Sequence, residues 1–448
     1  MENFIVKYLS CISSFYYSII CALIVFISHT FGLELLAIIS IGLSVSLGLL
    51  FSSSLNFVLV PALTIFFTLS EKNSFNGQGK FYSFGSLFTV SVVVAIFIGC
   101  LIYHLINNRK DYYYKHAFKS PLFYGILILS ISFLLNNFIY KERFFWKDLG
   151  FSIALVIAYL GVFLLLYVGL KFDEKLKSNI VFALFIASMV VTLEFYSLFV
   201  TGQIKFTDGE IVKESIVTGW GIWNTIGCYL SMLLPIHFYL ASFVKRYGFI
   251  FYGTGLISYL AIVLSLSRSS LLAGTFVLGI SVIVSCFFGE NKKVNRIITS
   301  VLFVCAIGGI ILMWDKIANV LGDYLERGLD DNGRFEIYAT GWKKFLSHPV
   351  FGCGFYNSHH INEVGLPFGY HNTIVQMMAS CGVIGLLAYL YHRYQTVALF
   401  IKQRCVKNFY LMLCICALLI TSLLDIHMFS LYPTLYYILI LITIEKTK

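Results

Sequence analysis

The sequence predicts an all-α fold, a polytopic transmembrane helical bundle of about 12–14 spans that forms a single integral membrane domain over residues 1–448. Hydrophobic residues make up 59% of the chain and charged residues only 12%, so water could not solvate it as an ordinary globule. Apolar runs close to the ~20 residues that cross a bilayer recur almost throughout, and about fourteen can be counted. These observations exclude a soluble protein.

The first half of the chain indicates a scaffold, because the runs up to about Leu170 carry few ionisable residues. The run from about Ser14 to Ile27 has the length of a signal-peptide core. No small-residue cleavage site follows it, however, and a second apolar run begins at once. We therefore expect this run to be the first span.

The basic residues predict the orientation. The net charge of +10 would suggest nucleic acid as the partner of a soluble protein, but in this chain the positive-inside rule applies. If residues 315–370 are external, the opposite loops, including 392–407, and the termini carry 19 Lys and Arg, against 8 in the other external loops. Both termini are therefore expected to be cytoplasmic.

Residues 315–370 form a long external loop within this domain. Loops of this length in membrane proteins usually carry function. An amphipathic pattern from about Arg334 to Leu346 predicts a short helix within it. Two further external features, a loop at 201–222 and a tight turn at 267–270, are expected on the same side.

The turn "SLSRSSLLAG" holds the first candidate site residue, Arg268, with Ser267 placed as N-cap of the following helix. A cation at a helix N-terminus is unfavourable, because the exposed amides already carry partial positive charge. An anion would resolve this conflict, so Arg268 and these amides are a candidate phosphate site. The alternative is an interfacial arginine that extends to the lipid headgroups.

His371 is the second candidate, at the mouth of the apolar run "GYHNTIVQMMASCGVIGLL". At 100° per residue, Gly382 falls nearly on the helix stripe of His371, and Gly385 lies within about 40° of it. Glycines at these positions would let a helix or a lipid chain approach the backbone. A neutral His371 could accept a proton from a sugar hydroxyl, and the alternative is an interfacial histidine above a packing seam.

Other polar residues in the second half are weaker candidates. Arg334 either serves the site or pairs with an acidic residue at 330 or 331. His359 and His360 with His371 suggest zinc, but no Cys or carboxylate completes a ligand spacing, so we expect no metal and no cofactor. Asp425 and His427, in "LLDIHMF", are a second polar pair that could face the site.

In combination these residues resemble the O-antigen ligase and O-antigen polymerase superfamily, bacterial membrane glycosyltransferases that use polyprenyl-pyrophosphate-linked sugars. The resemblance covers about residues 215–395, the expected catalytic region. The signature His, then Asn, Ser or Gln, nine residues, Gly, two residues, Gly is matched by His371, Asn372, Gly382 and Gly385. An Arg, three residues, Leu element is matched by Arg268 and Leu272, and a loop pattern by Gly333, Arg334, Trp342, Pro349, Gly352 and Gly354.

The chain departs from this pattern at one point. Members of the superfamily commonly carry an arginine shortly before a Pro-Asn pair in the loop that enters the earlier span. Here Asn224 is preceded by Trp223, and residues 201–222 contain no arginine. Arg334 or Lys213 could supply the second cation for the pyrophosphate, although lysine is the weaker bidentate partner.

The resemblance implies a metal-independent, inverting glycosyltransferase in the bacterial cytoplasmic membrane, with its active site on the external face. Arg268, helped by Arg334, would bind the undecaprenyl pyrophosphate of a glycan donor, and Asn372 would orient the donor or the acceptor. His371 would deprotonate a glycan, lipid or cell-wall acceptor, and other polysaccharide-assembly proteins are further candidate partners. The likeness favours a polymerase of polysaccharide repeat units; the alternatives are a ligase and, from another class, a flippase or transporter.

Overall fold

The computed structural model of the chain describes residues 2–56, 84–110, 114–139, 146–207, 209–218, 221–312, 314, 333–355, 360–361 and 367–446. Helices dominate these ranges, which confirms the all-α prediction. In chain order they are α1 (Glu2–Ile12), α2 (Phe15–Phe31), α3 (Glu34–Phe51), α5 (Phe84–Asn107), α6 (Tyr114–Ala117), α7 (Pro121–Ile139), α8 (Trp146–Val156), the π-helical turn η3 (Ile157–Gly161), α9 (Val162–Gly169), α10 (Glu174–Val200), α11 (Trp223–Phe243), α12 (Gly248–Leu264), α13 (Arg268–Phe287), α14 (Lys292–Leu312), α16 (Arg334–Ser347), α17 (Thr373–Lys402), α18 (Val406–Leu423) and α19 (Leu431–Lys446).

The chain is a multi-pass membrane protein. Within the described ranges, nine helices are long and apolar enough to cross a bilayer, or ten if α1 and α2, bent by 71°, count as one span. This number is below the 12–14 spans expected from the sequence. Helices α12 and α19 have only 17 and 16 residues, and residues 57–83 lie outside the described ranges.

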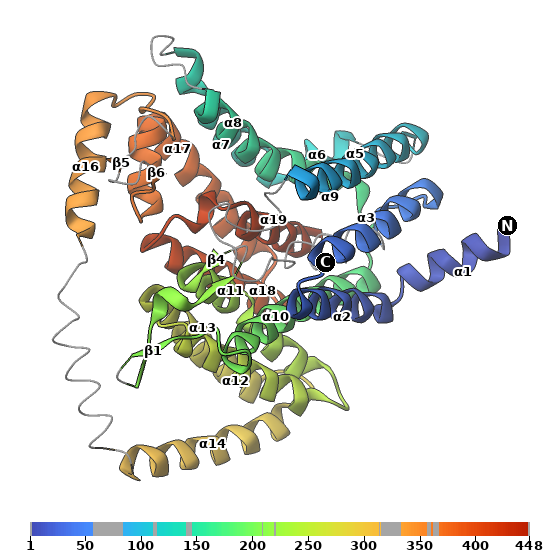
Figure 1. Cartoon of the computed structure of the whole chain (residues 1–448), viewed down its shortest axis with the longest axis vertical. Coiled ribbons are helices and arrows are strands. Elements are labelled where there is room, and N and C mark those ends of the chain that lie inside the picture. The colour runs from blue at the N-terminus through green and yellow to red at the C-terminus, as the bar shows by residue number, and fades with distance from the viewer. Residues whose placement is uncertain are drawn as a thin grey trace.

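Helix α11 lies at the centre of the bundle. Its membrane-spanning window is 94% buried, whereas the windows of the other candidate spans are between 11% and 78% buried. It packs against α10, α12, α13 and α18. In Figure 1 the helices α11, α18 and α19 occupy the middle of the molecule, with α1 to α3 on one flank and α16 on the opposite flank. The start of α11 therefore lies where several helices can contribute side chains.

Short hairpins occupy parts of the two loops expected to be external. Strands β1 (Phe206–Thr207) and β2 (Glu210–Ile211) pair antiparallel, as do β3 (Val217–Thr218) and β4 (Gly221–Ile222). A 3-10 turn, η4 (Lys213–Ser215), joins the two hairpins. In the longer loop, α16 confirms the helix predicted from Arg334, and β5 (His360–Ile361) pairs with β6 (Pro367–Phe368).

Helix α17 corrects two sequence-based predictions. It continues to Lys402, so residues 392–402 are helical and the expected inside loop 392–407 is reduced to a short connection before α18. Gly382, with φ 66° and ψ −161°, interrupts the helix. The prediction that His371 shares one continuous helix stripe with Gly382 and Gly385 is therefore wrong, because the 100° rotation per residue does not pass through a non-helical residue.

Candidate active site

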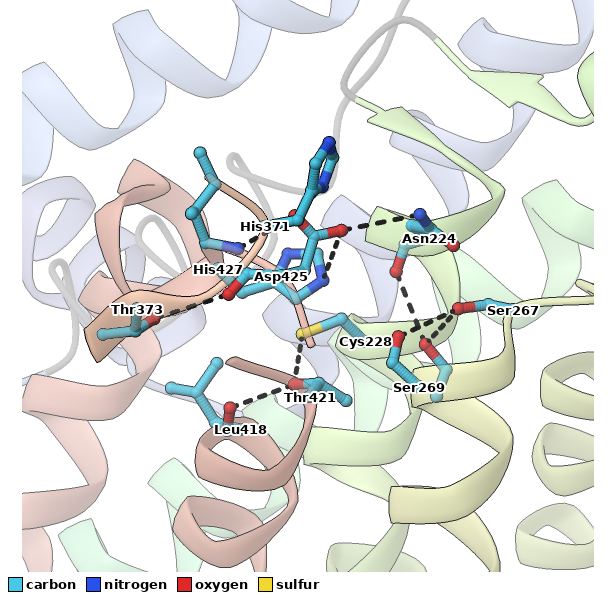
Figure 2. A network of polar contacts seen from close by, with 12 residues as sticks. Asn224, Cys228, Ser267, Ser269, His371, Thr373, Leu418, Thr421, Asp425 and His427 are labelled. Atoms are coloured by element: carbon cyan, nitrogen blue, oxygen red, sulfur yellow. Dashed lines mark hydrogen bonds and ion pairs between the residues drawn. The ribbon is translucent and has the colours of Figure 1, made fainter. Parts of the chain in front are cut away.

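The N-terminal ends of α11, α13 and α17 meet the segment 424–430, which joins α18 to α19 (Figure 2). Gly227 permits the contact between α11 and α13, because a Cβ there would lie 2.6 Å from Cβ of Ser270. The Ser231 hydroxyl then donates to the Ser270 carbonyl at 2.9 Å. The small residues of the two helices thus bring Asn224, near the start of α11, next to the turn that carries Arg268.

His371 pairs with Asp425. The distance from His371 Nδ1 to Asp425 Oδ1 is 3.2 Å, and the histidine side chain keeps 30% of its surface exposed. A proton on Nδ1 directed at the carboxylate leaves Nε2 as the acceptor, which is the tautomer a general base requires. His371 has a φ of 48°, a conformation that non-glycine residues adopt rarely. Tyr338 of α16 donates to its carbonyl at 3.4 Å.

Asp425 connects His371 to the rest of the site. Its Oδ1 also accepts the Ile426 backbone N–H at 2.8 Å. Its Oδ2 accepts from Nδ2 of Asn224 at 3.5 Å and lies 3.7 Å from Nε2 of His427. The carboxylate is thus surrounded by donors on both oxygens, as Figure 2 shows. Asp425 and His427 stand out in the sequence as a polar pair, but the sequence does not predict the pairing of Asp425 with His371.

Asn372 caps the N-terminal end of α17. Its Oδ1 accepts the backbone N–H groups of Ile374 and Val375, at 2.8 and 3.1 Å, as the N-cap of the helix. Its Nδ2 donates to the Leu423 carbonyl at 2.8 Å. One amide hydrogen is left for other partners. Asn372 therefore fixes the start of α17 against the end of α18, and this fixes the position of His371 beside Asp425.

Arg268 is the first residue of α13 and is exposed. Ser267 occupies the N-cap position as expected, but its hydroxyl does not bond the helix amides. It lies 2.8 Å from the hydroxyl of Ser270, which in turn donates to the Asn224 carbonyl at 3.5 Å. The predicted N-cap is therefore correct in position and wrong in bonding. The contacts from Ser270 through Asn224 and Asp425 reach His371, so the turn of Arg268 and the imidazole belong to one end of the bundle.

A stretch of the long loop is inserted at the break in α17. The backbone N–H groups of Cys353 and Gly354 donate to the carbonyls of Ala379 and Ser380 at 2.8 and 2.9 Å, and Val383 N–H donates to the Pro349 carbonyl at 2.8 Å. These bonds satisfy backbone groups that the break frees from the helix ladder. The structure thereby joins residues 349–354 to the helix that His371 precedes.

The glycines of the sequence motif make this insertion possible. A Cβ on Gly382 would collide with the backbone of Val350, and a Cβ on Gly352 with the backbone at Ser380 and Cys381. Both glycines also have positive φ, 66° and 73°. A Cβ on Gly385 would collide with the Cys381 side chain of the same helix, so this glycine accommodates the bend rather than a neighbouring helix or lipid chain.

Two side chains from the first half of the chain bind the backbone where the loop is inserted into α17. Buried Asp148 of α8 accepts the Phe355 N–H at 2.6 Å, and Asn136 of α7 donates to the Ser380 carbonyl at 3.3 Å. The sequence predicts only a scaffold in this half of the chain, so neither residue was expected to contact the site. An ionisable residue just after the start of an apolar run was the available signal for Asp148.

Residues 253–390 match the O-antigen ligase family. This match supports the resemblance of this part of the chain to the O-antigen ligase and polymerase superfamily. No curated protein matches the chain. The matched range contains Arg268, Arg334 and His371, whereas Asn224 and Asp425 lie outside it, although they contact the site.

The remaining residues that resemble the superfamily pattern have different environments. Arg334 begins α16, one turn before Tyr338, which contacts His371. Lys213 lies over the Trp223 ring, with Nζ 5.8 Å from its centre, beside the start of α11. Leu272 is 59% exposed and is therefore not packed within the bundle. The acidic residues considered as partners of Arg334 lie outside the described ranges.

An apolar cleft of about 340 Å³ lies between α16 and α17. Its lining comes from the two helices that flank His371, and consists of Tyr338, Ala339, Gly341, Trp342, Val375 and Met378. Gly341 permits the close packing at the base of the cleft, because a Cβ there would lie 2.5 Å from Val375. An apolar ligand in this cleft would end next to the imidazole.

The described part of the chain contains no group of three or more His, Cys, Asp or Glu arranged to hold a metal. His359 lies outside the described residues, and only the backbone of His360, in β5, is described.

Asp425 and His427 form a buried charged pair. Burial disfavours the ionised carboxyl of Asp425, but His427 and His371 stabilise it and lower its pKa well below the usual value. Burial also disfavours the charged imidazole of His427, but the neighbouring Cys228 and Asp425 favour the charged form and raise its pKa to about 9. Below about pH 9, the positive charge of His427 balances the negative charge of the Asp425 carboxylate beside His371.

This pair predicts a decline of stability at alkaline pH. His427 keeps its proton up to about pH 9 in the folded protein but has an ordinary value of 6.5, so its stabilising contribution is complete below pH 6.5 and is lost as the pH rises towards 9. We expect the melting temperature of the purified protein to fall over this interval. In His427→Gln the same interval should give a flatter profile, and an equally steep decline in that variant would contradict the assignment.

Proposed function

We propose that the protein is a glycosyltransferase that moves a glycan from undecaprenyl pyrophosphate to an acceptor sugar hydroxyl and polymerises the repeat units of a surface polysaccharide. The pairing of His371 with Asp425 carries this proposal. A carboxylate on Nδ1 and a partly exposed ring suit an imidazole that removes a proton from an alcohol. The match of residues 253–390 to the O-antigen ligase family supports the reaction class.

In this mechanism the acceptor oxygen attacks the anomeric carbon as its proton passes to Nε2 of His371. The bond between that carbon and the pyrophosphate oxygen breaks, and undecaprenyl pyrophosphate leaves with the bond's electrons. Attack opposite the leaving group inverts the anomeric configuration. Asp425 stabilises the imidazolium that forms, in the way a carboxylate orients a catalytic histidine elsewhere.

Arg268 and Arg334 are the proposed contacts of the pyrophosphate. The guanidinium group pairs with phosphate oxygens in a bidentate manner, and positive charge there stabilises the negative charge that grows on the leaving group. Arg268 begins α13, so the free amides of its first turn add to the positive field. The apolar cleft between α16 and α17 would take the first isoprene units of the carrier.

Analysis of the glycans that accumulate in a strain without the gene tests the proposal. If the missing protein is a polymerase, single repeat units accumulate on the lipid carrier at the external face. Long polymers stranded on the carrier would instead indicate a ligase, and repeat units trapped on the cytoplasmic side a flippase; either result overturns the polymerase assignment. The wild-type chain should restore glycan length, whereas Arg268→Ala should not. The matched control is Arg246→Ala, at an exposed arginine that follows the C-terminal end of α11, whereas the site lies at the N-terminal end of that helix.

A further inference from the structure

An arginine whose guanidinium nitrogens are buried lies far from the candidate active site along α17. Arg393 stands 20 residues after the start of the helix at Thr373 and 9 before its end at Lys402. Its neighbours come from the middle of other helices: Tyr437 from α19, and Tyr159 from the π-helical turn η3 within the 24-residue span Trp146–Gly169. Arg393 is therefore placed in the interior of the membrane domain, where ionisable groups usually have a function.

Tyrosine rings surround the guanidinium. Its central carbon lies 4.8 Å from the ring centre of Tyr389 and 4.9 Å from that of Tyr437. Both tyrosines are buried, and the Tyr437 hydroxyl lies 2.9 Å from Nε2 of His392. Cation–π contacts of this kind stabilise the positive charge. The ring faces do not, however, accept the in-plane hydrogen bonds that a guanidinium donates.

No carboxylate pairs with Arg393 among the described residues. Its Nε, Nη1 and Nη2 are all buried and make no well-formed hydrogen bond, and the hydroxyl of Tyr437 is the only hydrogen-bonding group that acts on the guanidinium in this part of the chain. The ion pairs found in the described ranges do not include Arg393 either. A buried charge without a counter-charge or hydrogen bonds is strongly unfavourable, and proteins satisfy such groups with water or an ion. Water would satisfy the donors, but only an anion also balances the charge.

We propose that Arg393 holds a small monovalent anion, chloride under physiological conditions, at the edge of its guanidinium. Two N–H donors along one edge of the planar fork can bind one spherical acceptor, while the rings of Tyr389 and Tyr437 cover the faces of the guanidinium. The sequence-based prediction placed this residue in an inside loop, where solvent would have satisfied it. The kink and the length of α17 bring it instead among the tyrosines.

The anion site supports the segment that carries Asp425. The hydroxyl of Tyr159 donates to the Met428 carbonyl at 2.8 Å, and Thr434 donates to the same carbonyl at 3.1 Å. Met428 follows His427 directly. Occupancy of the site therefore holds the tyrosines in the packing that supports residues 425–428, and loss of the anion should lower the stability of the whole protein.

Halide-dependent melting of the purified full-length protein tests this proposal. Unfolding is followed by tryptophan fluorescence in sodium chloride or bromide and in sodium gluconate at equal ionic strength. We expect the halides to raise the melting temperature by at least about 2 °C in the wild type. Arg393→Met, which keeps the apolar stem, should lose this difference, whereas Arg404→Met, at an exposed arginine, should keep it.

Two results would overturn the proposal: equal melting in halide and gluconate for the wild type, or a halide effect of the same size in Arg393→Met. If Arg393→Met cannot be purified, the comparison of wild-type melting in halide and gluconate tests the proposal. Crystals grown in bromide should then show anomalous density beside the guanidinium, and a water-sized peak without anomalous signal would rule out the anion.

Discussion

Replacement of His371 by glutamine is expected to reduce the transfer rate by about 10²–10⁴-fold, the usual contribution of a general base. Glutamine keeps a polar side chain of similar length but cannot take up a proton. The donor should still bind, because the pyrophosphate contacts are assigned to arginines. Transfer is measured with purified protein and a polyprenyl-pyrophosphate-linked glycan, and donor affinity in the same preparation by titration.

A matched substitution at an exposed histidine, His116→Gln, controls for the change of residue type and should leave the rate unchanged. Asp425→Asn tests the pairing: the asparagine oxygen can still accept from Nδ1 of His371, but the charge that stabilises the imidazolium is lost, so we expect a smaller decrease. A rate in His371→Gln close to that of the wild type would refute the mechanism.

The sequence was sufficient for the features that depend on local pattern. Hydropathy predicted the membrane bundle, and amphipathic spacing predicted α16 to within a residue of where it begins. Asp425 could not be assigned from the sequence as the partner of His371, because the two are 54 positions apart and only the contact of α17 with the segment after α18 brings them together. For the same reason Asp148, in the first half of the chain, was missed.

Periodicity was misleading where a glycine leaves the helical conformation. The spacing between His371, Gly382 and Gly385 predicts a continuous stripe, because an extrapolated helix places all three on one side. The structure shows that these glycines and the loop glycines Gly352 and Gly354 serve one contact, in which the loop backbone bonds the broken helix. Two motifs that seemed independent in the sequence are therefore two halves of one joint.

Gly382→Ala should disrupt this joint. An alanine at φ 66° and ψ −161° is strained, and its Cβ would collide with the Val350 backbone, which cannot rotate away as a flexible side chain could. We expect a loss of unfolding free energy of at least about 2 kcal/mol, measured by denaturant titration. We also expect transfer to fall by about 100-fold or more, because small displacements of catalytic groups have effects of that size.

The control for this substitution is Gly279→Ala, within α13, where a Cβ would meet no atom within 4 Å. That variant should be neutral or more stable by about 0.5–1 kcal/mol, since alanine favours the helix over glycine. If Gly382→Ala behaved like Gly279→Ala in both assays, the inserted loop would not hold His371 in place. The beginning of α17 would then have to be positioned by the Asn372 cap and Asp425 alone, and the loop glycines would need another explanation.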